Sequence, residues 1–467
     1  MRTTRRTTVT GILLLMLGIV SPALGGGERT NIQGMGMART FVATSRGLDA
    51  VGINPANLAA PDESLITFGL MPLGIHVGSD FMTYGLYNEY FTGVESEDGR
   101  EPRYLTDSDK RKILGSFPDE IGRASAHLEL RPVGVSVRLA DFGRVSFTMT
   151  DYVSASGIVP RDFASFILYG NTPGSLYDFG DAAAYATWLR EYALTYAMAM
   201  PVPEFVRSLT AGAAVKLVHG FGHFEIDRFN TRLLTGTDGV LDGSIDVHGR
   251  LSGSEPLRGS SDVAFQMFPA PAATGFGLDL GVASDVNEYL RVGLSITDIG
   301  SVRWTGNVDE IVRTGTIHLD DPLNEAQRDS VENAVMGETR SGGAFTTSLP
   351  TTLRLGVAVE LHKIPGLKEF FWREWTLACD YNQGLVESAG VAALGRLSMG
   401  LEFRPWNFLP LRTGLSFFGA DGFSFAFGFG LHSGSFEFDL ASEHVNYMLS
   451  EESFAHGSVA LGMRVKI

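Results

Sequence analysis

The sequence predicts an all-β protein, a transmembrane antiparallel β-barrel of about 14 strands with an N-terminal segment that plugs its lumen. Three observations predict this fold. Many segments alternate apolar side chains with small or polar ones, and a strand sends successive side chains to opposite faces. These segments are roughly 10 residues long, the length that a tilted strand needs to cross a bilayer. A secretory signal peptide precedes them all.

The predicted signal peptide covers residues 1–25. Arg2, Arg5 and Arg6 form a basic start, residues 11–20 form a short apolar core, and Ala23-Leu24-Gly25 provides a small-residue cleavage site. Such a core is too short to span a membrane as a helix. We therefore expect export through a cleaved signal peptide and residence in the outer membrane.

Residues 26–61 form the next predicted unit, a hatch or plug segment. This stretch is rich in Gly, Ala and Asn and lacks sustained alternation. Residues 62–467 form the predicted barrel. Its strands are expected near 65–70, 128–139, 145–150, 192–198, 209–217, 276–282, 290–297, 353–361, 397–404, 423–430, 436–441 and 458–467, with weaker segments near 223–232 and 374–382.

The clearest strand runs from Phe423 to Gly430. Every second residue from Phe423 to Phe429 is Phe, while the alternate positions carry Ser, Ala and Gly. An ionised side chain facing lipid costs roughly 2–4 kcal/mol near the bilayer midplane. We therefore expect the strand face that carries charged side chains to line the lumen. The predicted lumen-lining charges are Glu402, Arg404, Arg412, Glu437 and Asp439.

Long polar segments at 92–122, 160–187 and 318–343 are expected to form solvated loops with short helices. Trp residues near predicted strand ends fit an aromatic girdle at the membrane interface. They are Trp304, Trp372, Trp375 and Trp406. The alternative for these side chains is packing within the loops.

Composition excludes several classes of function. The net charge of −16 argues against a nucleic-acid partner. The single cysteine, Cys379, excludes an internal disulfide.

No enzyme chemistry, cofactor or metal site is predicted. His219 and His223 share a strand parity and make a metal pair conceivable, but a turn with two exposed imidazoles is the favoured interpretation. The triplet Ser442-Glu443-His444 is not a catalytic signature, because adjacent strand residues point to opposite faces.

One stretch carries a family resemblance. The run from Gly34 to Ala38, followed by Asn54-Pro55-Ala56, resembles the N-terminal hatch of the FadL-type outer-membrane transporters of hydrophobic compounds. It also resembles the hatch of the related PorV-like barrels. An Asn side chain can close a turn and the following Pro fixes φ, which suits a compact plug. Asn54, Pro55 and Ala56 are therefore the predicted hatch motif.

The resemblance implies a barrel that binds or passes small hydrophobic compounds across the outer membrane. The alternative that it leaves open is a PorV-like scaffold or shuttle for secreted proteins. The expected partners are accordingly the lipid bilayer and a hydrophobic small molecule, or a secreted protein in the second case. An outer-membrane hydrolase and a soluble secreted β-sandwich are two further alternatives, and the small, uncharged face of many strands disfavours the sandwich.

Overall fold

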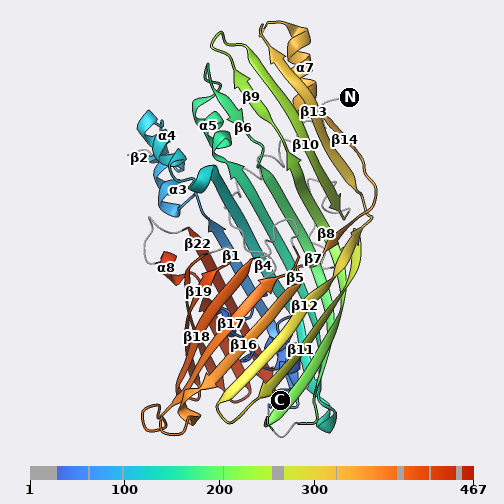
Figure 1. Ribbon diagram of the computed structural model, residues 1–467, viewed down its shortest axis with the longest axis vertical. Helices are drawn as coiled ribbons and strands as arrows, with labels where there is room; N and C mark the ends of the chain where they lie inside the picture. The colour runs from blue at the N-terminus through green and yellow to red at the C-terminus, as the bar shows by residue number, and fades with distance from the viewer. Residues whose placement is uncertain are drawn as a thin grey trace.

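The computed structural model describes residues 29–61, 64–96, 99–202, 205–254, 268–321, 323–386, 394–419, 422–448 and 455–467 (Figure 1). The predicted signal peptide, residues 1–25, lies outside these residues.

Fourteen long antiparallel strands of the described chain close into a barrel. Closure occurs where the first strand pairs with both its successor and the last strand, so that Phe68 lies opposite Val135 and Val465. The predicted fold class is confirmed. In order around the barrel the strands are β1 (Ile66–Ser79), β4 (Ile121–Arg138), β5 (Arg144–Pro160), β7 (Ala183–Ala199), β8 (Ser208–Phe229), β11 (Ala273–Asp285), β12 (Leu290–Trp304), β16 (Thr352–Glu360), β17 (Glu374–Gly384), β18 (Gly395–Trp406), β19 (Leu409–Phe418), β20 (Ser424–Ser433), β21 (Phe436–Ser442) and β22 (His456–Lys466).

One side of the wall continues beyond the barrel as an extension, which stands at the top of Figure 1. We call this the loop end, and the opposite end, where β1 begins and β22 finishes, the terminal end. The extension contains the upper part of β8 with β6 (Leu176–Asp178), β9 (Arg232–Thr235), β10 (Leu241–Gly253), β13 (Asp309–Leu319), β14 (Glu338–Ser341) and β15 (Phe345–Ser348).

Short helices occupy the long connections. At the loop end they are α3 (Tyr84–Phe91), α4 (Asp107–Leu114), η3 (Pro118–Glu120), α5 (Arg161–Tyr169), α7 (Glu325–Met336) and α8 (Val445–Met448), together with the small hairpin β2 (Val94–Ser96) and β3 (Gly99–Glu101). At the terminal end, η4 (Ala140–Phe142) and η5 (Leu361–Lys363) form strand connections. Among the described residues, none of the helices has the length and apolar character needed to cross a membrane.

The alternation along β20 follows the predicted parity. Phe427 is 45% exposed on the outer face, whereas its neighbour Ala426 is fully buried inside. The apolar outer face and the small inner face are the arrangement that a lipid-embedded barrel requires.

Two local predictions are wrong. Trp304 does not belong to an interfacial girdle, because β15 pairs with the end of β12 and Trp304 is fully buried there, donating a hydrogen bond from Nε1 to Thr347 Oγ1 at 2.9 Å. Trp372 and Trp406 are exposed at the terminal end, as a girdle requires.

The other error concerns His219 and His223, which lie within β8 and not on a turn. A bulge shifts the register between them, so that His219 lies opposite Arg190 and His223 opposite Thr187. An extra residue reverses the parity of a strand. The two imidazoles therefore face opposite sides of the wall and cannot share a metal ion.

Candidate functional site

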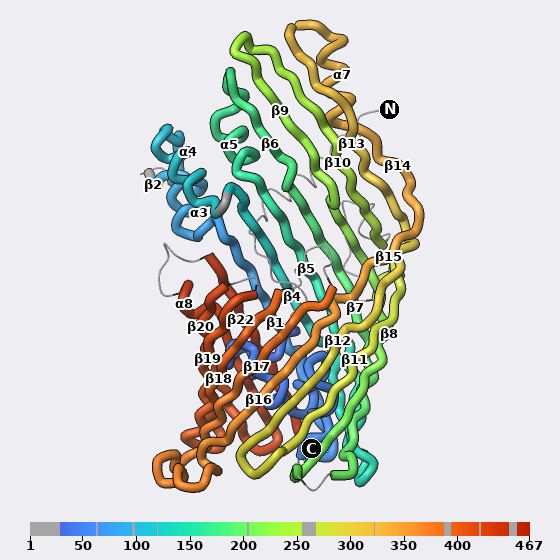
Figure 2. Tube along the Cα trace, viewed as in Figure 1, coloured from blue at the N-terminus to red at the C-terminus, as the bar shows by residue number. Residues whose placement is uncertain are grey.

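Residues 29–61 fold into a plug within the terminal half of the barrel, where Figure 2 shows them in blue. The plug contains α2 (Ile32–Met35), η1 (Gly47–Ala50) and η2 (Pro55–Ala59). Ala38, Val42 and Leu58 are fully buried. The segment is therefore a packed core inside the lumen.

The predicted hatch motif lies where the plug meets the wall. Asn54 caps η2 by accepting a hydrogen bond from Ala56 N at 3.2 Å, and Pro55 occupies the first helical position, where its fixed φ is favourable. The Asn54 amide also donates to the carbonyls of Val42 in the plug and Val282 in β11, each at 3.2 Å. Asn54 thus closes the turn and ties it to the barrel.

A set of inward-facing glycines lets the plug backbone approach the wall. At each of them a Cβ atom would lie under 3.0 Å from an atom of the plug, and a glycine in a strand often marks such an approach. We call this set the glycine belt. Its members are Gly74, Gly212, Gly281, Gly293, Gly356, Gly400, Gly414, Gly428 and Gly462.

Buried charges also join the plug to the wall. Arg29 forms ion pairs with Asp298 and with Glu191, the latter at 2.8 Å. Asp380 of β17 accepts hydrogen bonds from two plug amides, Phe41 N at 2.7 Å and Val42 N at 2.8 Å. Because unpaired buried charges are costly, these contacts fix the plug in one orientation.

Two further ion pairs join the plug to segments that lie far away in the sequence. They are Arg39 with Glu443, in the link between β21 and α8, and Asp49 with Arg464 of β22. These partners were not predicted, because nothing in the local pattern indicates which residue faces the plug.

The five predicted lumen charges lie together on the inner wall. Arg412 is the centre, with its guanidinium 2.6 Å from Glu402 and 2.7 Å from Asp439. Arg404 adds a contact to Glu402 at 2.8 Å. Glu437 joins the network through Arg464, at 3.2 Å, and also pairs with Lys466 at 2.8 Å. Arg464 bridges Asp439 and the plug residue Asp49, so this network also holds the plug.

Two cavities lie on opposite sides of the plug. The first, here called the terminal-side vestibule, has a volume of about 420 Å³ and is lined by charged side chains such as Asp49, Glu402 and Arg464. The second, here called the loop-side pocket, has a volume of about 100 Å³.

Plug and wall side chains line the loop-side pocket together. Its apolar lining includes Met35 of the plug and Tyr152, Leu189 and Leu349 of the wall. Its polar lining includes His76 and the charged residues Arg29, Arg39, Glu129 and Glu191. Arg29 stacks on the Tyr152 ring at 4.1 Å, which closes one side. A recess in which apolar side chains lie beside fixed polar groups can hold and orient a small molecule.

Comparison with known proteins places the chain in a family. Residues 56–443 match the model of DUF5723, a family of unknown function. The chain belongs to DUF5723. No curated protein matches it.

Among solved structures, this DUF5723 chain is similar to the toluene transporter TodX of P. putida, at 12% identity over 94% of this chain and 97% of that one, with a TM-score of 0.43. It is also similar to the toluene transporter TbuX of Ralstonia pickettii, at 13% identity over 95% and 99%, with a TM-score of 0.46. A Pseudomonas aeruginosa FadL homologue shares 12% identity over 96% and 100%, with a TM-score of 0.43. Nothing in these comparisons supports the PorV-like alternative. The function proposed below rests on the geometry of the barrel itself.

Proposed function

We propose that this DUF5723 barrel lies in the outer membrane and takes up small hydrophobic compounds through its lumen. The observation that carries the proposal is the loop-side pocket, which lies directly against the plug and is lined by Met35, Tyr152, Leu189 and Leu349. The outward apolar parity and the predicted signal peptide support the outer-membrane location.

The volume of the loop-side pocket limits the size of its ligand. The pocket measures about 100 Å³, which is less than the roughly 150 Å³ of an apolar cavity that accepts benzene. A one-ring aromatic is therefore the largest compound to test first, and it fits only if the plug or wall side chains give way slightly.

The plug lies between the loop-side pocket and the terminal-side vestibule. A compound that enters the pocket reaches the vestibule only if part of the plug shifts. The glycine belt places plug atoms directly against the strands, so a gap along the wall opens only where the plug moves away from these glycines. Binding at the loop side and movement of the plug are the two steps of the proposed uptake.

Filling the loop-side pocket tests this proposal. Leu189 lines the pocket, so Leu189→Trp should lower uptake of a radiolabelled one-ring aromatic to the level of cells that lack the protein. The matched control is Leu194→Trp on the same strand, because Leu194 is 58% exposed on the outer face. The amount of folded barrel in the outer membrane is measured for both. Equal uptake by the two variants, with equal barrel levels, contradicts the proposal.

A further inference from the structure

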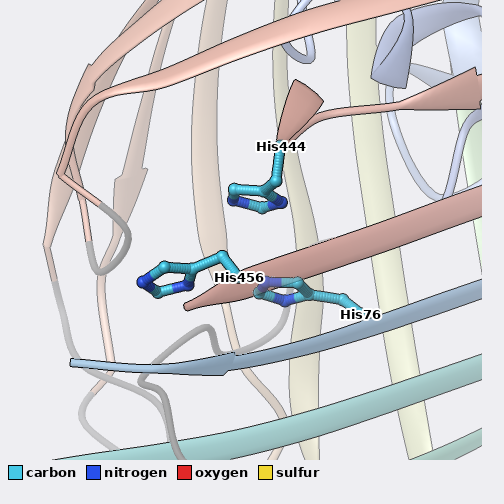
Figure 3. Close-up of side chains that lie close together, drawn as sticks. All are labelled: His76, His444 and His456. Carbon is cyan, nitrogen blue, oxygen red and sulfur yellow. The ribbon is translucent and has the colours of Figure 1, made fainter. Parts of the chain in front are cut away.

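Four of the ten histidines gather inside the lumen, on the loop side of the plug. They come from separate elements: His76 from β1, His127 from β4, His444 from the link between β21 and α8, and His456 from the start of β22. Figure 3 shows three of them, with the His444 ring facing those of His76 and His456. We call His76, His444 and His456 the histidine cluster.

The geometry of the histidine cluster is that of a group of metal ligands. One ring nitrogen from each residue lies within 4.8 Å of the others. The residues are 5%, 1% and 6% exposed for His76, His444 and His456, so the cluster is shielded from bulk water. The rings of His76 and His444 are stacked with centroids 4.8 Å apart, and His444 and His456 lie at 5.4 Å.

We propose that the histidine cluster binds a divalent transition-metal ion of the class that prefers imidazole, with Zn²⁺ as the leading candidate. Imidazole nitrogens suit Zn²⁺, Ni²⁺ and Cu²⁺, and three histidines leave a further position open. A Zn–N distance of about 2.0–2.1 Å sets ligand nitrogens roughly 3.4 Å apart in a tetrahedral site. The rings of His76 and His444 are stacked with 7° between their planes, so binding an ion requires the side chains to rotate until one nitrogen of each points to the same centre.

The surroundings of the histidine cluster supply a second layer of contacts. The Ser458 hydroxyl lies 3.1 Å from Nδ1 of His444, which fixes the orientation of that ring. A ligating histidine commonly uses its other ring nitrogen in this way. Glu443 adds a carboxylate next to His444, and Arg39 of the plug pairs with it, so the cluster lies beside a plug anchor.

The loop-side pocket gives an ion a route to the histidine cluster. His76 lines this pocket, and so does His127, whose ring stacks on that of His76 with centroids 6.2 Å apart. The site also joins β1 to β22, the first and last strands of the barrel, at the place where the sheet closes. A bound ion would therefore cross-link the closing seam and raise the resistance of the barrel to unfolding.

Metal titration of the folded barrel tests the site. The full chain is purified in detergent through a tag without histidine, stripped with a chelator, and titrated with Zn²⁺ by calorimetry and with Co²⁺ by visible absorption. We expect one equivalent of each ion to bind, the Co²⁺ spectrum to report nitrogen ligands, and the unfolding temperature to rise with Zn²⁺ concentration.

Two variants and a matched control separate metal binding from ring packing. His76→Gln and His444→Gln should each weaken Zn²⁺ binding at least about tenfold, because loss of a ligand exceeds the effect of losing an outer contact. His223→Gln is the control, since His223 is a buried lumenal histidine of β8 outside the cluster and should leave binding unchanged. Ser458→Ala keeps all three ligands and should weaken binding less than either ligand variant.

The titration of the wild-type barrel tests the proposal even if a ligand variant does not fold. Absence of Zn²⁺ and Co²⁺ binding by the wild-type barrel overturns the proposal and leaves the cluster as stacked rings that pack the seam. Binding that persists unchanged in folded His76→Gln or His444→Gln overturns it as well. The proposal is independent of uptake, because a barrel that transports nothing can still bind the ion.

Discussion

The two cavities on either side of the plug differ in size and chemistry. The terminal-side vestibule, of about 420 Å³, is lined mainly by polar and charged side chains, whereas the loop-side pocket, of about 100 Å³, combines the apolar surfaces of Tyr152, Leu189 and Leu349 with buried charges such as Arg29. Ion pairs hold the plug on both sides, through Asp49 in the vestibule and through Arg29 in the loop-side pocket. The two sides differ instead in the compartment that the plug bounds, which is wide and charged toward the terminal end and small toward the loop end.

The largest expected effect comes from breaking a buried anchor of the plug. Arg29→Met leaves Asp298 and Glu191 without their plug partner, and removing one member of a buried ion pair costs about 3–5 kcal/mol. Chemical unfolding of the barrel in detergent measures the change. Lys216 lies 2.6 Å from Asp298 and retains part of the network, which places the expected value at the lower end.

A loop arginine provides the control for this loss. Arg207 pairs with Glu288 at 3.3 Å and both side chains are largely exposed, and such pairs contribute roughly 0–1 kcal/mol. Arg207→Met should therefore change the free energy of unfolding little. If both arginine variants lost the same free energy of unfolding, the buried charges would not be what holds the plug.

A smaller effect is expected from the glycine belt. A Cβ at Gly414 would lie 2.4 Å from the carbonyl carbon of Met37, so Gly414→Ala should destabilise the barrel by about 1–3 kcal/mol through overpacking. At Gly134, also an inward strand glycine, the nearest atom would lie 3.5 Å away, in Arg131. Gly134→Ala should therefore change the free energy of unfolding little in the same measurement. If both variants lost the same stability, the close contact between the glycine belt and the plug would not contribute to stability.

The smallest effect concerns the packing behind the loop-side pocket. Trp304→Phe removes the hydrogen bond from Nε1 to Thr347, a residue that lines the pocket, and leaves space at a fully buried position, so it should cost about 1–2 kcal/mol. Trp406→Phe at the exposed terminal end should change stability by less than about 0.5 kcal/mol. Thermal unfolding of both variants measures the two losses of stability. A larger loss for Trp406→Phe than for Trp304→Phe would contradict this prediction.

The sequence predicts the barrel well because a strand has a fixed side-chain period. The outward face from Phe423 to Phe429 and the inward charged face that includes Arg412 can be assigned without a structure. Lipid tolerates the Phe side chains and excludes the charged ones. The same rule fails across a bulge. His219 and His223 share a parity in the sequence, yet the extra residue between them sends them to opposite faces.

The site itself depends on contacts between distant segments. Nothing near His444 in the sequence indicates that His76 will lie against it, because their meeting requires the closure of the barrel between β1 and β22. The glycine belt is likewise formed by contacts between segments that lie far apart in the sequence. Gly400 and Gly414 look like ordinary strand glycines until the plug is placed against them.

The most direct test of the account locks the plug to the wall and measures uptake. Ala43 of the plug and Ala358 of β16 lie in the same buried cluster, and both positions already carry a Cβ. Ala43→Cys and Ala358→Cys, with Cys379→Ser to remove the native thiol, are introduced together so that oxidation links the plug to the wall. The account predicts that uptake of a one-ring aromatic stops on oxidation and returns on reduction, while each single-cysteine variant is unaffected. Unchanged uptake with the cross-link fully formed would contradict it.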